Sequence, residues 1–160
     1  MTDVYLGLGS NQRARYNLRS CLHALENQFG RIDWSPLYVG PAVGFAGDDF
    51  FNMVVRIRTN LTVEDLHQWL HELEDRHQRD RSQPRFSDRT LDVDILLYGE
   101  RIQTKGIVLP RGEITRYAHV LKPLADLAPD LLHPAEQKTM QALWQAFAAS
   151  HDIKLQLTTL

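Results

Sequence analysis

The chain has 160 residues, a formal net charge of −2, and 43% hydrophobic residues. This length suits one domain with its own core, so we expect a single domain over residues 1–160. The acidic balance argues against nucleic acid or an anionic membrane as the main partner. No apolar run approaches the roughly 18 residues of a membrane span, and the N-terminus lacks a signal-peptide pattern. The lone Cys21 fits a reducing compartment, so we expect a cytoplasmic protein. We also expect it to be a monomer.

The first half of the chain alternates strand and helix patterns. A short apolar strand is predicted over residues 4–8, and the Gly-Ser-Asn turn after it leads into a helix. A second strand is expected over residues 32–38, a Gly- and Pro-rich loop over 40–49, and a strong strand over 50–59. The helix carries an apolar stripe made of Leu18, Cys21, Leu22, Leu25 and Phe29.

The second half opens with Thr62 and Asp65, which resemble a capping box. The helix that they begin has an apolar face, and residues 75–88 after it are predicted as its frayed end plus a long loop. A buried strand is expected over 89–99, a short strand over 107–109, helices near 117–128 and 137–149, and an edge strand over 153–157. The order strand-helix-strand-strand-helix-strand predicts an α+β protein: a ferredoxin-like α/β sandwich, with a mainly antiparallel sheet and helices on its faces.

Two aspartates interrupt the apolar strand of residues 89–99. Asp92 and Asp94 are two residues apart, so their carboxylates point to the same face of the strand. Two like charges side by side on a strand repel each other, and a divalent cation would remove that repulsion. Mg²⁺ typically takes one or two protein carboxylates, with phosphate oxygens and water as its other ligands. The alternative is that both carboxylates simply face solvent.

The segment that leads into this strand is rich in arginine. Guanidinium groups bind phosphate through paired hydrogen bonds, so an arginine loop beside two carboxylates indicates a polyphosphate site. In such a site the metal lies on one side of the phosphates and the arginines on the other. The alternative is a solvated charge run, partly paired with nearby aspartates. The arginines are Arg76, Arg79, Arg81, Arg85 and Arg89.

Other motifs are absent or incomplete. The sequence lacks the P-loop pattern, and Gly7 and Gly9 lack the third glycine of the dinucleotide fingerprint. His67 and His71 share a helix face, but no Cys or His completes a zinc site. Cys21 lies on an apolar stripe, which predicts a core residue rather than a nucleophile.

Several segments together resemble the 6-hydroxymethyl-7,8-dihydropterin pyrophosphokinase family of folate biosynthesis. The resemblance covers nearly the whole chain and implies a single pterin pyrophosphokinase domain. It implies transfer of pyrophosphate from ATP to the hydroxymethyl group of a reduced pterin, release of AMP, and two Mg²⁺ ions as cofactors. The segments are LGSN (8–11), SPLYVGPAVG (35–44), FFN (50–52), RTLDVDILLYG (89–99), LP (109–110) and PLADLAPDLLHP (123–134).

The resemblance also implies roles for individual residues. Asp92 and Asp94 match the aspartates that hold the metal ions, and Arg79, Arg81 and Arg89 match catalytic arginines. The residues expected at the ATP site are His71, Glu74, Arg81, Arg89, Ile95, Arg111 and Arg116. The residues expected at the pterin site are Pro41, Val43, Phe50, Asn52, Phe86 and His119.

Some residues depart from the family pattern. Phe86 replaces a Trp, Arg111 follows Leu-Pro where the family usually has His, and His119 replaces a Phe that stacks on the pterin. At that last position Tyr117 is the alternative ring. The expected metal site is intact, so an active pyrophosphokinase is one interpretation. A paralogue that uses a modified pterin, or that binds pterin and nucleotide without turnover, is the second.

A ferredoxin-like RNA-binding or interaction module is the third interpretation. RNA-binding sheets of this kind use aromatic rings on one face as a stacking platform. Phe50 and Phe51 are adjacent, so they point to opposite faces of their strand. This arrangement and the acidic balance both count against the third interpretation.

Overall fold

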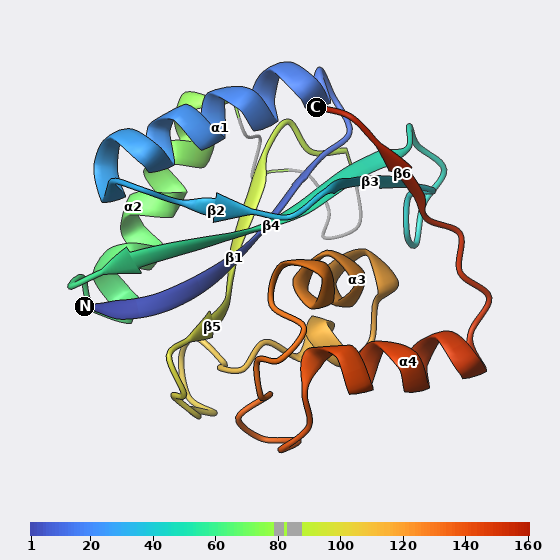
Figure 1. The fold of residues 1–160 in the computed structure, drawn as a ribbon. Helices are drawn as coiled ribbons and strands as arrows, with labels where there is room; N and C mark the ends of the chain where they lie inside the picture. The colour runs from blue at the N-terminus through green and yellow to red at the C-terminus, as the bar shows by residue number, and fades with distance from the viewer. Residues whose placement is uncertain (79–81, 83–87) are drawn as a thin grey trace.

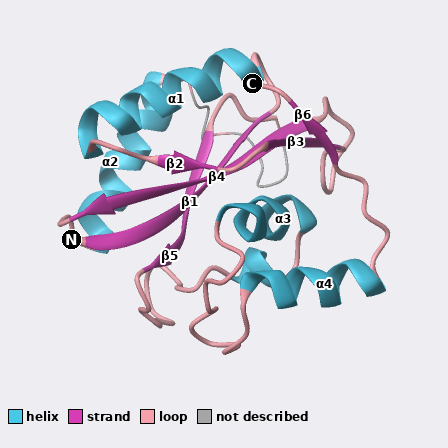
Figure 2. Cartoon of the chain, in the orientation of Figure 1, coloured by secondary structure: helices cyan, strands magenta, loops and turns pink. Residues whose placement is uncertain are grey.

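The sheet of the protein lies between two helical layers in a computed structural model that describes residues 1–78, 82 and 88–160 (Figure 1). Helices α1 and α2 cover one face, while α3 lies on the other face with α4 packed outside it (Figure 2). The elements are β1 (Thr2–Ser10), α1 (Ala14–Phe29), β2 (Asp33–Trp34), β3 (Leu37–Gly40), β4 (Phe50–Thr59), α2 (Val63–Arg76), β5 (Asp92–Tyr98), a 3₁₀ turn (Gly112–Thr115), α3 (Ala118–Leu127), α4 (Met140–Ser150) and β6 (Gln156–Thr158).

The strand order is β5-β1-β4-β3-β6, with β2 also paired to β4. All of these pairs are antiparallel. Two crossovers, through α1 and α2, place β1 between β4 and the edge strand β5. This arrangement confirms the predicted ferredoxin-like α+β fold.

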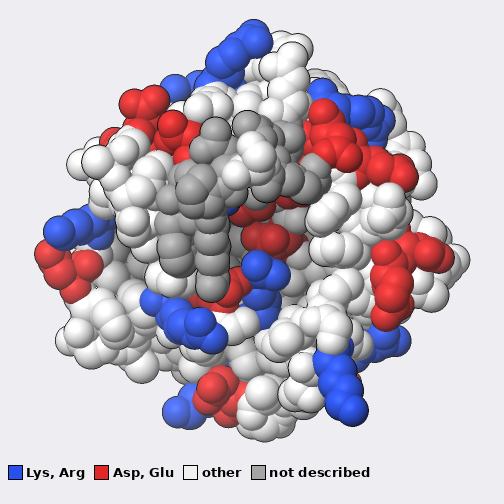
Figure 3. All heavy atoms as spheres, turned by 180° about the vertical axis from the view of Figure 1, so that it is seen from behind, with Lys and Arg blue, Asp and Glu red and all other residues white. Residues whose placement is uncertain are grey.

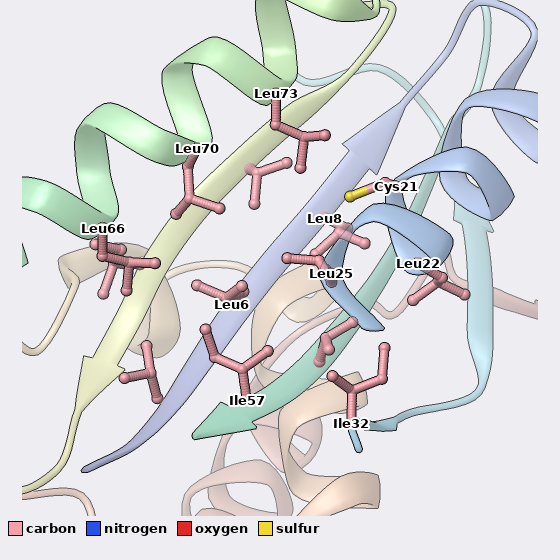
Figure 4. Packing of buried hydrophobic residues seen from close by; sticks show 14 of the residues in the cluster. Leu6, Leu8, Cys21, Leu22, Leu25, Ile32, Ile57, Leu66, Leu70 and Leu73 are labelled. Carbon is pink, nitrogen blue, oxygen red and sulfur yellow. The ribbon is translucent and has the colours of Figure 1, made fainter. Parts of the chain in front are cut away.

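The larger core lies between the sheet and helices α1 and α2 (Figure 4). Leu6 and Leu8 of β1 face the predicted apolar stripe of α1 and the buried leucines of α2. Cys21 is fully buried in this core, and burial raises the pKa of its thiol. The prediction that Cys21 is a core residue is therefore confirmed. Thr62 begins α2 as predicted, because its hydroxyl accepts a hydrogen bond of 3.1 Å from the Asp65 N–H.

A β-bulge in the edge strand β5 directs two leucine side chains into the smaller core under α3. Tyr5 pairs with Leu97 while Leu6 pairs with Ile95, so Leu96 is an extra residue in β5. The bulge reverses the alternation of side chains, and Leu96 and Leu97 both pack toward α3. The strand therefore contributes apolar side chains to both cores, although its first half carries the two aspartates.

The strand expected over 4–8 extends over Thr2–Ser10, and the strand expected over 89–99 is Asp92–Tyr98. Three other predicted strands differ further. The strand expected over 32–38 is two short strands, because Ser35 intervenes and exchanges hydrogen bonds with Val54 through its own N–H and hydroxyl. Pro36, which follows, has no N–H to donate to a ladder. Residues 107–109 form only an isolated bridge between Gln103 and Leu109. The C-terminal strand is Gln156–Thr158 rather than 153–157.

Among the described residues, no helix has both the length and the apolar composition needed to cross a membrane.

The buried stripe of α1 gives a test of the core. Leu25→Ala should lower the free energy of unfolding by about 2–5 kcal/mol, because Leu25 is fully buried between helix and sheet. Leu132→Ala is the control, since Leu132 is 53% exposed and its truncation should cost less than about 1 kcal/mol. Urea denaturation of both variants measures the difference. Equal losses would contradict the placement of Leu25.

Candidate active site

A cavity of about 730 Å³ opens over the β5-β1-β4 part of the sheet. Acidic and basic side chains meet in a hollow on this side of the molecule (Figure 3). Of the predicted site residues, those that line the cavity are Pro41, Val43, Phe50, Asn52, His71, Glu74, Arg89, Asp92, Asp94, Arg111, Arg116 and His119. The structure thus brings together residues that lie far apart in the sequence.

Four predicted site residues are not among those lining residues. Arg79, Arg81 and Phe86 lie outside the described part of the chain. Ile95 is described, and its side chain is buried in the core between the sheet and helices α1 and α2. Only the backbone of Ile95 is therefore available to a ligand on the opposite face of the sheet.

Two glycines form the floor of the cavity beside the aspartates. Asp92 pairs with Gly9 and Asp94 with Gly7, and Gly9 in turn pairs with Asn52 on β4. Paired residues share a face of the sheet, so the carboxylates and the Asn52 amide flank a strip without side chains. A Cβ on Gly9 would lie 2.9 Å from the Asn52 Oδ1 atom.

The role of these glycines was not predicted. The local sequence indicates only that Gly7 and Gly9 form an incomplete dinucleotide motif. The available signal was their spacing, because two glycines at alternate positions of a strand leave one face open.

Arg111 places a positive charge beside Asp94. Its Nη2 atom lies 3.6 Å from Asp94 Oδ1, and its Nε atom contacts the Glu113 carboxylate. The Arg111 N–H donates to the Leu96 carbonyl at 2.9 Å, which holds the segment after β5 against the edge of the sheet. Glu113 was not predicted, since the acidic partner of an arginine cannot be read from local sequence.

The electrostatics of the pair follow from burial and like charge. Burial raises the pKa of Asp94 well above the usual range of an aspartate, and the negative charge of Asp92 raises it further. The positive charge of Arg111 opposes the shift but does not cancel it. A cation at this site would therefore be bound in exchange for a proton on Asp94.

The Ser-Asn part of the LGSN motif fastens the segment before β5 to the end of β1. The Asn11 N–H donates to the Arg89 carbonyl at 3.0 Å, and the Arg89 N–H donates back to Asn11 Oδ1 at 2.8 Å. The Asn11 amide also donates to Asp88 Oδ1 at 2.7 Å, and the Ser10 hydroxyl to the Thr90 carbonyl at 2.6 Å. The motif, interpreted from the sequence as a turn, thus fixes the direction in which Arg89 enters the site.

Glu74 of α2 holds the first residues of β5 from the other side. Its carboxylate is only 5% exposed and accepts a hydrogen bond of 2.8 Å from the Val93 N–H. It therefore positions the strand between the two aspartates, as well as lining the cavity. One helical turn earlier, His71 also lines the cavity, and its ring lies 4.4 Å from that of His67.

Aromatic rings also line the cavity. Phe50 meets Phe45 edge to face with ring centroids 6.1 Å apart. His119 stacks on Tyr117 with centroids 5.2 Å apart, so both candidate rings line the cavity. Burial lowers the pKa of His119, and this outweighs the opposite effect of nearby carboxylates. Phe147 of α4 also lines the cavity and was not among the predicted site residues.

In the described part of the chain, no three His, Cys, Asp or Glu side chains converge into a metal cluster. Two carboxylates alone would leave most positions around Mg²⁺ for phosphate oxygens and water, as this ion prefers. The donor set therefore fits magnesium brought in with a nucleotide, and does not fit zinc.

The sequence matches known proteins over most of its length. A model of the 7,8-dihydro-6-hydroxymethylpterin-pyrophosphokinase family matches residues 5–129. A 2-amino-4-hydroxy-6-hydroxymethyldihydropteridine pyrophosphokinase of Pseudomonas aeruginosa is 40% identical over 140 residues, which cover 82% of this chain and 83% of that protein. A protein of the same name from Haemophilus influenzae is 32% identical over 160 residues, with coverage of 97% and 99%.

The fold also matches a solved structure. The HPPK-DHPS protein of Plasmodium falciparum, crystallised with pterin and p-hydroxybenzoate, superposes with a TM-score of 0.71 and 16% identity. The match covers 92% of this chain but only 43% of that longer chain. At this identity the match supports the fold alone.

The fold, the site and these matches define an ATP-dependent diphosphotransferase. The chain belongs to the 7,8-dihydro-6-hydroxymethylpterin-pyrophosphokinase family. Its reaction is the transfer of pyrophosphate from ATP to the hydroxymethyl group of the reduced pterin in folate biosynthesis. The resemblance found in the sequence is confirmed, and an RNA-binding role has no support.

The glycine floor can be tested by substitution. Gly9→Ala should fold, with a loss of stability of about 1–3 kcal/mol, because the new methyl group would displace the Asn52 side chain. Pterin affinity should fall with it. Gly7→Ala, on the same floor, is the comparison, since its methyl group would meet Leu96 and leave the Asn52 side chain in place. Urea denaturation and pterin titration measure the two effects, and unchanged pterin affinity in Gly9→Ala would contradict this role of the floor.

The raised pKa of Asp94, caused by burial and by the charge of Asp92, has a measurable effect on stability. The folded protein binds more protons than the unfolded chain between about pH 4 and about pH 8. Wild-type stability should therefore fall as the pH rises through this window. Asp94→Asn cannot ionise, so without divalent cations it should be more stable than wild type at neutral pH.

Urea denaturation in the presence of a chelator, at an acidic and at a neutral pH, measures this effect. Asp3→Asn is the control, because Asp3 pairs with Arg58 at the opposite end of the sheet. A loss of stability in Asp94→Asn at neutral pH would show that the carboxylate is net stabilising.

Proposed function

We propose that ATP and 6-hydroxymethyl-7,8-dihydropterin bind side by side in the cavity, with two Mg²⁺ ions held at Asp92 and Asp94. The observation that carries this proposal is the aspartate pair itself, which faces the cavity over a glycine floor. Two carboxylates on one face of a strand favour a divalent cation over an empty site. When bound, magnesium neutralises the triphosphate and lowers the pKa of the attacking hydroxyl.

The pterin is proposed to bind beside the aromatic rings of the cavity. Asn52 offers an amide that can both donate to and accept from the polar edge of the ring. Phe50 and His119 offer flat faces for stacking, and Pro41 and Val43 close the pocket on the loop after β3. Phe86, outside the described residues, remains a predicted member of this pocket.

The triphosphate is proposed to lie across the aspartates. Arg89, Arg111 and Arg116 line the cavity and can each donate paired hydrogen bonds to phosphate oxygens. His71 and Glu74 line it as well and are proposed to border the triphosphate. Arg79 and Arg81 remain predicted phosphate contacts, and Ile95 can contribute only its backbone.

The transfer is proposed to be direct. The hydroxymethyl oxygen attacks the β-phosphorus, the bond from that phosphorus to the α-phosphate oxygen breaks, and AMP leaves. The side chains hold the two substrates in line, which removes most of the entropic barrier to their encounter. The arginines balance the charge that develops on the phosphate oxygens. No enzyme nucleophile is required, and we propose that one monomeric domain in the cytoplasm carries out the reaction.

A second candidate function rests on the departures from the family pattern. Arg111 and His119 both line the cavity at positions where the family usually has other residues. They support a paralogue that acts on a modified pterin, or that binds pterin and nucleotide without turnover.

One assay separates these functions. With Mg-ATP and 6-hydroxymethyl-7,8-dihydropterin, wild type should release AMP, and Asp92→Asn should lower turnover by roughly two orders of magnitude or more, because a metal-binding charge is lost. Asp3→Asn, on the same sheet, should behave as wild type. Release of ADP would indicate ordinary phosphoryl transfer, and no product would favour the second function. Near-normal turnover in Asp92→Asn would contradict the metal assignment.

The pocket histidine gives a pH prediction. Burial lowers the pKa of His119, so the ring is neutral at pH 7 and gains a proton only below the ordinary value of about 6.5. A buried charge is costly, so pterin affinity should weaken as the pH falls. His119→Phe should remove this dependence and tighten binding through its larger apolar area. Pterin titrations of both proteins at an acidic and a neutral pH test this, and four equal affinities would refute stacking on His119.

A further inference from the structure

An arginine of the chain itself lies beside one of the two aspartates. Arg111 places Nη2 3.6 Å from Asp94 Oδ1 while its Nε contacts Glu113. Its backbone is fixed by the hydrogen bond to the Leu96 carbonyl. The guanidinium is thus held between two carboxylates at the wall of the cavity, and its side chain is 36% exposed.

This placement has opposite consequences for the two ligands of the site. A divalent cation bound to Asp94 would have a positive guanidinium beside it, competing for the same carboxylate. A triphosphate would instead offer that guanidinium new acceptors, and paired contacts with phosphate are among the strongest that arginine makes. Only the outer part of the side chain need move, because the backbone of Arg111 is anchored to β5.

We propose that Arg111 is an internal counter-ion that makes magnesium binding conditional on nucleotide. Without nucleotide, the positive charge of Arg111 beside Asp94 disfavours a second cation there and keeps the affinity for free Mg²⁺ low. When the triphosphate binds, Arg111 transfers from Asp94 to a phosphate, and the aspartates become available to the metal. This inference rests on the proposed metal site at Asp92 and Asp94, and it assigns Arg111 a positioning role between the two ligands.

Binding measurements test this role without turnover. Isothermal titration with Mg²⁺ alone should show affinity about tenfold tighter in Arg111→Gln than in wild type, because a neighbouring positive charge has been removed. Titration with α,β-methylene-ATP at saturating Mg²⁺ should show affinity about tenfold weaker in the same variant, because a charged phosphate contact is lost. Opposite changes for two ligands are not expected from a purely structural salt bridge.

Two further variants serve as controls. Arg101→Gln removes one positive charge from the same connection after β5, where Arg101 lies over the Tyr98 ring, and should change neither affinity. Arg111→Lys keeps the charge without the planar fork, so its affinity for Mg²⁺ alone should stay within about twofold of wild type. It also keeps the test valid if Arg111→Gln folds poorly.

The results distinguish a failure of the Arg111 role from a failure of the proposed metal site. If wild type binds Mg²⁺ with the nucleotide analogue, but Arg111→Gln and wild type bind Mg²⁺ alone equally, the counter-ion role is wrong and the metal site stands. If Arg111→Lys binds Mg²⁺ alone as tightly as Arg111→Gln, the charge is not the cause. If wild type binds no Mg²⁺ even with the analogue, the metal site fails and this inference fails with it.

Discussion

Two carboxylates on one face of an edge strand are the constraint around which the site is organised. Asp92 and Asp94 repel each other and contribute no apolar packing, so the strand that carries them needs other support. The glycines opposite them add no apolar packing on that face either. The cost of this arrangement is offset on the other face, where Val93 and Ile95 are buried against α1 and α2.

Polar anchors from three other segments fix where the aspartates point. Ser10 and Asn11 hold the residues before β5, Glu74 holds the N–H between the two aspartates, and the segment after β5 returns to the Leu96 carbonyl. These bonds are directional, whereas apolar packing is not, so they can set a carboxylate position that packing alone would leave loose. The bulge at Leu96 then returns the strand to both cores.

Two of the departures from the family pattern, Arg111 and His119, line the cavity away from the strand positions of the aspartates and glycines. Arg111 and His119 come from the segment after β5, while the aspartates and glycines lie on the sheet itself. A wall residue can change without altering the strand register that sets the metal site. We therefore interpret these substitutions as changes in how ligands are admitted and held, within the same pyrophosphoryl transfer.

The sequence by itself determined the element order, the shared face of Asp92 and Asp94, and the family, because periodicity and contiguous motifs are local properties. Only the tertiary structure decided which distant groups meet them. The anchoring of Arg89 by Asn11, the pairing of Gly9 with Asn52 and the approach of Arg111 to Asp94 join residues that chain folding brings together. No local pattern encodes such partners. The division of the strand at Ser35 was missed for the same reason, since its partner is Val54 on another strand.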